Sequence, residues 1–174
     1  HRTVSVAYGP AEKRKKIIQE GSDYVIINYD GVAIVADEIK KGGFDLIIVD
    51  EATHYKNAQT TRWKTLNRLL TDDTWLWMMT GTPAAQSPVD AYGLAKLVNV
   101  NSVPRFFGSF KDRVMQRISQ FKWVIKPIAT DIVFKALQPA IRFTKEECLD
   151  LPPMVYVKRE VELTKQQNKY YNQI

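Results

Sequence analysis

Cysteine is nearly absent from this chain of 174 residues, in which Cys148 is the single thiol. One cysteine cannot form an internal disulfide, and Cys148 has no Cys or His neighbour at metal-ligand spacing. The chain also has no recognisable signal peptide and no apolar run near the roughly 18 residues that cross a bilayer. We therefore expect a cytoplasmic protein.

The chain also lacks an initiator methionine and a glycine-rich loop of the form GxxxxGK[ST], which many nucleotide triphosphatases use to hold phosphates. It begins at His1 and enters a strand-like run at once. We therefore expect a fragment that is trimmed at its start.

Short runs of β-branched and aromatic residues alternate with segments of helical periodicity in the first half of the chain. This rhythm predicts βαβ units, and the nearly continuous apolar strands predict a parallel sheet covered by helices on both faces. The expected strands are residues 4–8, 24–28, 46–49 and 75–79, and further helices are expected over 89–98, 110–121 and 128–137. Beyond Pro152 and Pro153, the best linker candidate, we expect a strand over 155–163 and a helix over 164–174.

Positive charge is concentrated in the second half of the chain, whose net charge is +6. Residues 101–145 carry nine Lys or Arg and two Asp, whereas residues 21–60 carry three Lys and seven acids. A basic surface favours partners that bear phosphates, but a solvated basic face over an aromatic core is an equally good interpretation. The nucleic-acid-binding candidates are Arg105, Lys111 and Arg113, with Arg117, Lys122 and Lys126 in the same segment.

Two carboxylates, Asp50 and Glu51, directly follow the apolar run at 46–49. Open α/β sheets bind ligands at the carboxyl ends of their strands, so the position is as informative as the residue types. Asp50 is suited to bind a magnesium ion that accompanies nucleotide phosphates, and Glu51 to orient or deprotonate a water. The alternative is that both acids only cap the following helix.

A second polar segment, MTGTP at residues 79–83, follows the next apolar run. Thr80 and Thr82 flank Gly81, so hydroxyl groups and backbone can approach a phosphate or a carboxylate closely. The alternative is a simple turn before a helix that has Ser87 as its N-cap and Pro88 at its first position.

Together these segments resemble the first RecA-like domain of Swi/Snf-type, superfamily-two helicase-like ATPases, which carries DEAH-KN and TGTP motifs. The resemblance extends to VIINYDGV, QSPVDAYGL, LDLPP and LTKQQNKYY, and so covers nearly the whole chain. The compact spacing between motifs resembles phage or bacterial members, which implies a bacterial cell or a phage-infected host. The fold implied is a partial RecA-like (P-loop NTPase) α/β sheet over residues 1–98, a basic helical extension over 99–150, and over 151–174 a linker into a second RecA-like domain.

The resemblance implies ATP hydrolysis coupled to movement on double-stranded DNA, with Asp50 as the magnesium ligand and Glu51 as the second catalytic carboxylate. Thr53 stands where the family usually has His, and its neighbour His54 is as well explained as an ordinary surface histidine. Motif-coupling positions are Thr53, His54, Lys56, Asn57, Thr80, Gly81, Thr82 and Gln86, and possible DNA contacts are Asn28 and Tyr29.

In the family the phosphate loop precedes the segments seen here, and a second RecA-like domain that supplies an arginine finger follows them. ATP and Mg²⁺ are therefore expected only in the full-length protein, and the fragment alone should not hydrolyse ATP. The runner-up hypothesis is a non-catalytic nucleic-acid-binding or scaffold module derived from such an ATPase. A metal-dependent nuclease that uses Asp45, Asp50, Glu51 and Lys56 is a weaker third hypothesis.

Overall fold

The computed structural model describes residues 1–148, 150 and 155–173. The chain forms two compact units, residues 1–140 and 141–174, and each is described by itself. The linker candidates Pro152 and Pro153 lie outside the described residues, and the domain boundaries expected after residues 98 and 150 stay predictions.

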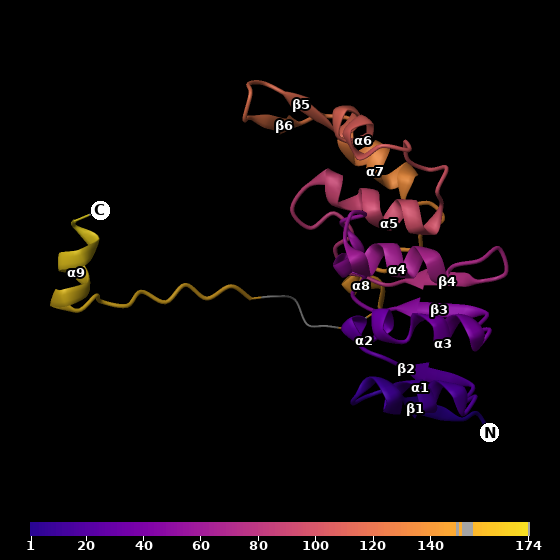
Figure 1. Ribbon diagram of the computed structural model, residues 1–174. Helices are drawn as coiled ribbons and strands as arrows, with labels where there is room; N and C mark the ends of the chain where they lie inside the picture. Colours follow the sequence, from indigo (N-terminus) through magenta and orange to yellow (C-terminus); the bar gives the residue numbers. More distant parts are fainter. Residues whose placement is uncertain (149, 151–154, 174) are drawn as a thin grey trace. The chain divides into compact units, whose positions relative to one another are not determined.

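The α/β class and the parallel pairing of the strands are confirmed in the first unit (Figure 1). All four expected strands form, and they pair in two parallel sheets, β1 with β2 and β3 with β4. The connections between them are helical, as a parallel pair requires. The elements are β1 (Val4–Val6), α1 (Ala11–Gln19), β2 (Tyr24–Ile26), α2 (Tyr29–Ile34), α3 (Ala36–Lys41), β3 (Leu46–Val49), η1 (Ala52–Tyr55), α4 (Thr61–Leu69) and β4 (Trp75–Met78).

Helices cover only one face of these strands, so the expectation of coverage on both faces was wrong for the described residues. On the covered face, Val25 packs against the cluster that holds Ile18 of α1, and Leu76 against the cluster that holds Trp63 and Leu66 of α4. Side chains alternate between the two faces along a strand, so every second residue points to the opposite face. This face is apolar, and no helix of the described residues covers it. Its residues are Val4, Val6, Tyr24, Ile26, Ile48, Trp75 and Trp77, each at least 49% exposed.

The segment after β4 forms a short 3-10 helix, η2 (Pro88–Asp90), and the helix α5 (Ala91–Val98), as the periodicity over 89–98 predicts. Helix α5 packs on β4 and η1, and Trp63 in α4 donates its indole N–H to the Gly93 carbonyl at 2.8 Å. The longest helices, α1 and α4, have nine residues each. None of the helices in the described part of the chain is long and apolar enough to cross a membrane.

A β-hairpin replaces the second half of the helix expected over 110–121. Helix α6 (Phe107–Val114) ends where β5 (Met115–Arg117) begins, and β5 pairs antiparallel with β6 (Trp123–Ile125). Residues 115–117 form a strand and not a helix because they pair with residues 123–125 across the turn, where Arg117 lies opposite Trp123. The helix expected over 128–137 is confirmed as α7 (Ala129–Ala136), which packs with α5 and α6 around Phe110.

The second unit contains α8 (Lys145–Cys148) and α9 (Lys165–Tyr171). The expected final helix is confirmed, and Thr164 and Gln167 form a capping box at its start. The strand expected over 155–163 does not form, because this exposed segment has no ladder partner among the described residues.

Candidate functional site

The carboxyl ends of β3 and β4 bring together the DEATH segment (DEATHYKN, residues 50–57) and the TGTP segment (MTGTP, residues 79–83). In the parallel register Val49 lies opposite Met78, and the pairing continues beyond the strands. Met79 N donates to Val49 O at 2.8 Å, and Ala52 N donates to Met79 O at 2.8 Å. The two segments that the sequence analysis selected therefore lie side by side, at the sheet edge where α/β proteins bind ligands.

Glu51 adopts a left-handed backbone conformation, with φ 45° and ψ 60°, and is the one non-glycine residue with positive φ in the described part of the chain. This conformation costs a non-glycine residue about 1–2 kcal/mol. Two contacts offset it: Glu51 N donates to the Asp50 carboxylate at 2.9 Å, and the Tyr29 hydroxyl donates to Glu51 O at 3.3 Å. Such strain is typical of functional sites, where neighbouring contacts impose a backbone that the chain alone would avoid.

Two threonine hydroxyls hold one oxygen of the Glu51 carboxylate. Thr53 Oγ1 donates to Glu51 Oε1 at 2.6 Å, and Thr80 Oγ1 donates to the same atom at 3.2 Å. Thr80 is itself positioned by the Thr82 N–H, which donates to Thr80 Oγ1 at 3.1 Å. Among the described residues Glu51 Oε2 accepts no hydrogen bond, so this oxygen is available to a water or substrate. The carboxylate does not cap η1, which argues against the simple capping interpretation.

The exposed side chain of Asp50 fits a magnesium ion that is bound together with nucleotide. One of its oxygens accepts the Glu51 N–H, and the carboxylate lies at the open end of β3. No cluster of three or more His, Cys, Asp or Glu occurs in the described ranges. Such a cluster is not required, because nucleotide-bound Mg²⁺ takes one or two protein carboxylates and completes its shell with phosphates and waters.

The Lys56 side chain connects the DEATH segment to the residues before α5. Its ammonium group donates to Gln86 Oε1 at 3.3 Å and lies 3.5 Å from the Asp90 carboxylate. Gln86 N donates to the same carboxylate at 3.2 Å. Asn57 has a local role, since its side chain accepts the Gln59 N–H at 2.9 Å in the turn before α4. Lys56 and Gln86, which are distant in sequence, therefore form one polar contact beside the site.

Gly81 lies within the TGTP segment and Ser87 lies four residues after it, and neither forms a hydrogen bond with Glu51 in the described part of the chain. A Cβ added at Gly81 would meet nothing within 4 Å, so the TGTP turn is open at this residue. Ser87 precedes Pro88 at the start of η2, as the turn interpretation predicted, but its hydroxyl contacts Met115 Sδ at 3.9 Å and does not cap the helix.

Tyr29 packs against the back of the DEATH segment. Its ring centroid lies 4.6 Å from that of His54 and 5.7 Å from that of Tyr55. Burial, with the nearby Asp50 and Glu51 carboxylates, raises the pKa of the Tyr29 phenol above its ordinary value of 10.0, which extends the pH range over which the phenol can donate a hydrogen bond. The neighbouring Asn28 accepts a hydrogen bond from Arg14 Nη1 at 2.7 Å. DNA contact by Asn28 and Tyr29 stays a prediction.

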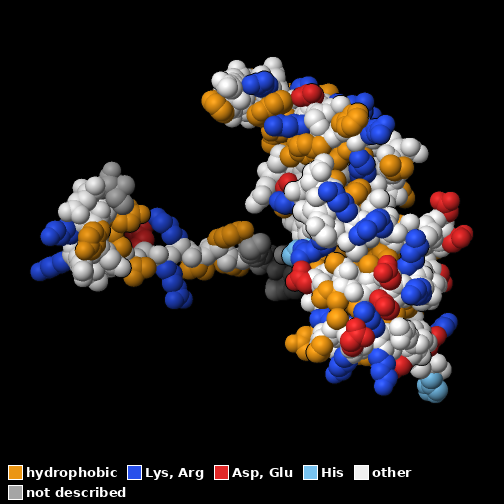
Figure 2. Space-filling model, viewed as in Figure 1, with side chains coloured by type: hydrophobic (Ala, Val, Ile, Leu, Met, Phe, Trp, Pro, Cys, Tyr) orange, Lys and Arg blue, Asp and Glu red, His pale blue; other side chains and the backbone are white. Residues whose placement is uncertain are grey.

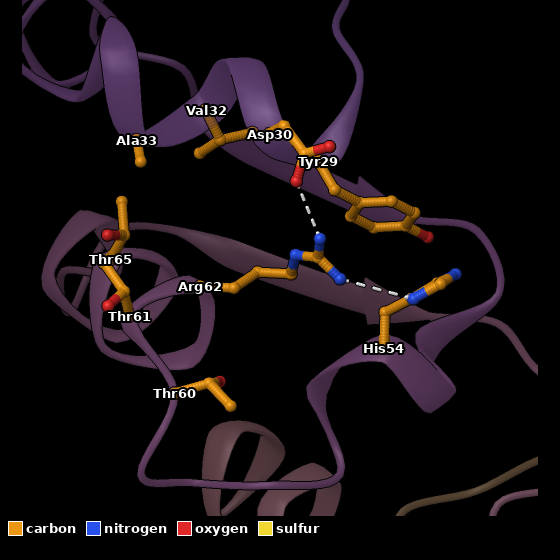
Figure 3. A pocket seen from close by; sticks show the side chains of 9 residues that line it. All are labelled: Tyr29, Asp30, Val32, Ala33, His54, Thr60, Thr61, Arg62 and Thr65. Carbon is orange, nitrogen blue, oxygen red and sulfur yellow. Dashed lines mark hydrogen bonds and ion pairs between the residues drawn. The ribbon is translucent and has the colours of Figure 1, made fainter.

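Arg62, which the sequence analysis missed, links Tyr29 and His54 in a cavity of about 440 Å³ (Figure 3). Its Nη2 donates to Asp30 Oδ1 at 2.8 Å, and its Nη1 lies 3.3 Å from His54 Nδ1. The guanidinium also lies over the Tyr29 ring, 5.2 Å from the centroid. Since Asp30 is 32 residues away in sequence, no local pattern identified this pair.

Two of the three basic residues proposed as DNA contacts lie over aromatic rings of the protein itself. The Arg105 guanidinium lies 5.4 Å from the Phe106 ring centroid, and Lys111 Nζ lies 3.8 Å from a Trp123 ring centroid. Arg113 is exposed on α6. Their contact with nucleic acid stays a prediction.

Comparison with known proteins gives one family match. The model of the SNF2-related domain matches residues 3–174, which is nearly the whole chain. No curated protein matches the chain. The family match confirms the Swi/Snf-type resemblance that the DEATH and TGTP segments indicated.

Proposed function

The chain belongs to the SNF2-related domain family, whose members are generally helicase-like ATPases, and we propose that it forms part of a DNA-stimulated ATPase that moves along duplex DNA. The arrangement of Glu51 carries the proposal. Its carboxylate accepts hydrogen bonds from Thr53 in one motif and from Thr80 in the other. Both motifs therefore act on one oxygen of a single carboxylate.

Asp50 would hold Mg²⁺, directly or through a water, at the end of β3. When bound, the ion would supply positive charge that stabilises the negative charge developing on the phosphate during phosphoryl transfer. Asp50 has a second role in this proposal, because it accepts the Glu51 N–H and so helps to hold the left-handed turn.

Glu51 would orient the attacking water and accept its proton through Oε2. The two threonine hydroxyls on Oε1 restrict rotation of the carboxylate, which keeps Oε2 in one direction. In the hydrolysis step the water oxygen bonds to the γ-phosphorus, the bond to the β-phosphate oxygen breaks, and ADP and phosphate are released. The hydrogen bond from the Thr80 hydroxyl would change during this step, because the Glu51 carboxylate that accepts it would take up a proton.

We propose that further parts of the same protein complete the ATP site. A phosphate-loop strand would pair with β4, and its helix would cover the exposed face that includes Trp75 and Trp77, which are 72% and 57% exposed. An exposed apolar face of this kind normally marks an interface. A second RecA-like domain would supply an arginine finger. The duplex DNA partner and a cytoplasmic location, which suits the single Cys148, belong to the same proposal.

The test is Glu51→Gln in the full-length protein that carries this domain. We expect ATP turnover in the presence of duplex DNA to fall by at least about 100-fold, because the variant cannot accept a proton, while nucleotide binding persists. Glu20→Gln is the matched control, because it makes the same change from carboxylate to amide at an exposed position at the end of α1. This variant should turn over ATP normally.

Unchanged turnover in Glu51→Gln would remove Glu51 from the mechanism. If the unmodified full-length protein neither binds nor hydrolyses ATP, the alternative of a non-catalytic nucleic-acid-binding or scaffold module would replace the proposal.

A further inference from the structure

The β5–β6 hairpin projects from the first unit (Figure 1), and it contacts α6 at its base and through Lys111, whose ammonium group lies 3.8 Å from a Trp123 ring centroid. Met115 packs against the hydrophobic cluster around Phe110, and Lys126 N donates to Val114 O at 3.0 Å. Beyond these contacts the hairpin residues are mostly exposed. The outer part of the hairpin therefore presents its side chains to a partner rather than to the core.

The hairpin and the preceding helix α6 belong to a strongly basic segment of the chain. Residues 105–126 contain six Lys or Arg and one Asp, a net charge of +5, whereas the whole chain carries +6. A concentrated positive surface attracts a polyanion, and phosphate contacts of this kind give salt-dependent binding to nucleic acid. The charged residues are Arg105, Lys111, Arg113, Arg117, Lys122 and Lys126, with Asp112 as the acid.

The hairpin turn carries an aromatic side chain that is almost fully exposed. Phe121 is 88% exposed, and Ile118 on the other side of the turn is 56% exposed. Arg117 braces the turn, since its Nε donates to Ser119 O at 3.2 Å and its Nη2 to Gln120 O at 3.4 Å. Figure 2 shows hydrophobic and basic side chains next to one another on this projection. The braced turn thus presents Phe121 beside Lys122.

We propose that the β5–β6 hairpin binds unpaired nucleic acid, with Lys122 contacting phosphate and Phe121 stacking on a base. A phenyl ring cannot hydrogen-bond to base edges, but it offers a face for stacking, and a cationic surface with an aromatic platform is suited to single strands. In an intact duplex the base faces are already covered by neighbouring pairs. This inference rests on the proposed function for the nature of the partner, and it extends that function from duplex DNA to an unpaired segment.

The experiment measures binding of the 174-residue chain to a fluorescent oligothymidine of about 20 nucleotides, longer than the roughly 4–16 nucleotides that single-strand-binding folds cover. The same sequence in duplex form is the second probe. Phe121→Ala should weaken oligothymidine binding about tenfold, the effect of losing one stacked base, and change duplex binding little. Phe121→Trp should restore the affinity, which separates stacking from a structural effect.

Lys122→Gln should weaken binding to both probes and reduce the salt dependence of binding. Lys41→Gln, which removes the same charge from an exposed position at the end of α3, should leave both affinities unchanged. The proposal is overturned if Phe121→Ala binds oligothymidine like the unmodified chain, if it weakens both probes equally, or if Lys41→Gln matches Lys122→Gln. Because the assay contains no nucleotide triphosphate, its outcome is independent of the Glu51 test.

Discussion

Replacing Gly93 by alanine tests how tightly α5 packs against the DEATH segment. An alanine Cβ at this position would lie 2.3 Å from Lys56 O and 2.4 Å from Tyr55 O, whereas ordinary contacts begin at 3.4 Å. Both neighbours are backbone carbonyls, so no flexible side chain can move aside. Helix α5 or η1 must therefore shift by about 1.1 Å, the difference between 2.3 and 3.4 Å.

Two terms of opposite sign determine the size of the effect. Overpacking costs up to about 3 kcal/mol when backbone has to move, whereas replacing glycine by alanine inside a helix gains about 1 kcal/mol. We expect Gly93→Ala to lower the free energy of unfolding by about 2 kcal/mol, which corresponds to a fall in Tm of about 4–8 °C for a chain of this size. Displacement of the Gly93 carbonyl would also weaken its hydrogen bond from the Trp63 indole.

The assay is urea and thermal unfolding of the 174-residue chain, followed by circular dichroism. Gly108→Ala in α6 is the matched control, because a Cβ there meets nothing within 4 Å. That variant should be unchanged or stabilised by up to about 1 kcal/mol, since only the helix-propensity term acts. If Gly93→Ala is as stable as Gly108→Ala, the close packing of α5 on η1 is refuted.

Two further predictions concern the segment around the site. Thr60 caps α4 by accepting the Trp63 N–H at 3.2 Å, so Thr60→Ala should lower the free energy of unfolding by about 1 kcal/mol in urea titrations, while Thr60→Ser keeps the stability; equal stability of all three proteins would contradict the cap. Burial raises the pKa of the Tyr55 phenol from 10 to about 12, so the fold favours the neutral form. Its stability contribution is complete below pH 10 and is lost as the pH rises toward about 12. Tyr55→Phe should therefore lose less stability than the unmodified chain over this alkaline range, and parallel pH curves for the two proteins would argue against the buried phenol.

Local sequence patterns identified the four parallel strands and the position of the two motifs. The strand at 46–49 ends directly before Asp50 and the strand at 75–78 ends two residues before Thr80, and parallel strands place such ends at one sheet edge. Residue type and spacing along the chain were sufficient for this step. The same reasoning failed at 110–121, where helical periodicity hid a hairpin that depends on pairing between Arg117 and Trp123.

What the sequence determined by itself is the four parallel strands, the position of Asp50 and Glu51 directly after one of them, and the family to which the motifs point. The tertiary structure decided how Glu51 is held, because its left-handed backbone depends on Tyr29 and its carboxylate on Thr80, residues that lie 22 and 29 positions away. It also decided that Arg62 bonds Asp30, and that one face of the strands remains exposed. The physical reason is the same in each case: a pattern along the chain encodes local periodicity, whereas contacts between distant segments exist only after the strands have paired and the helices have packed.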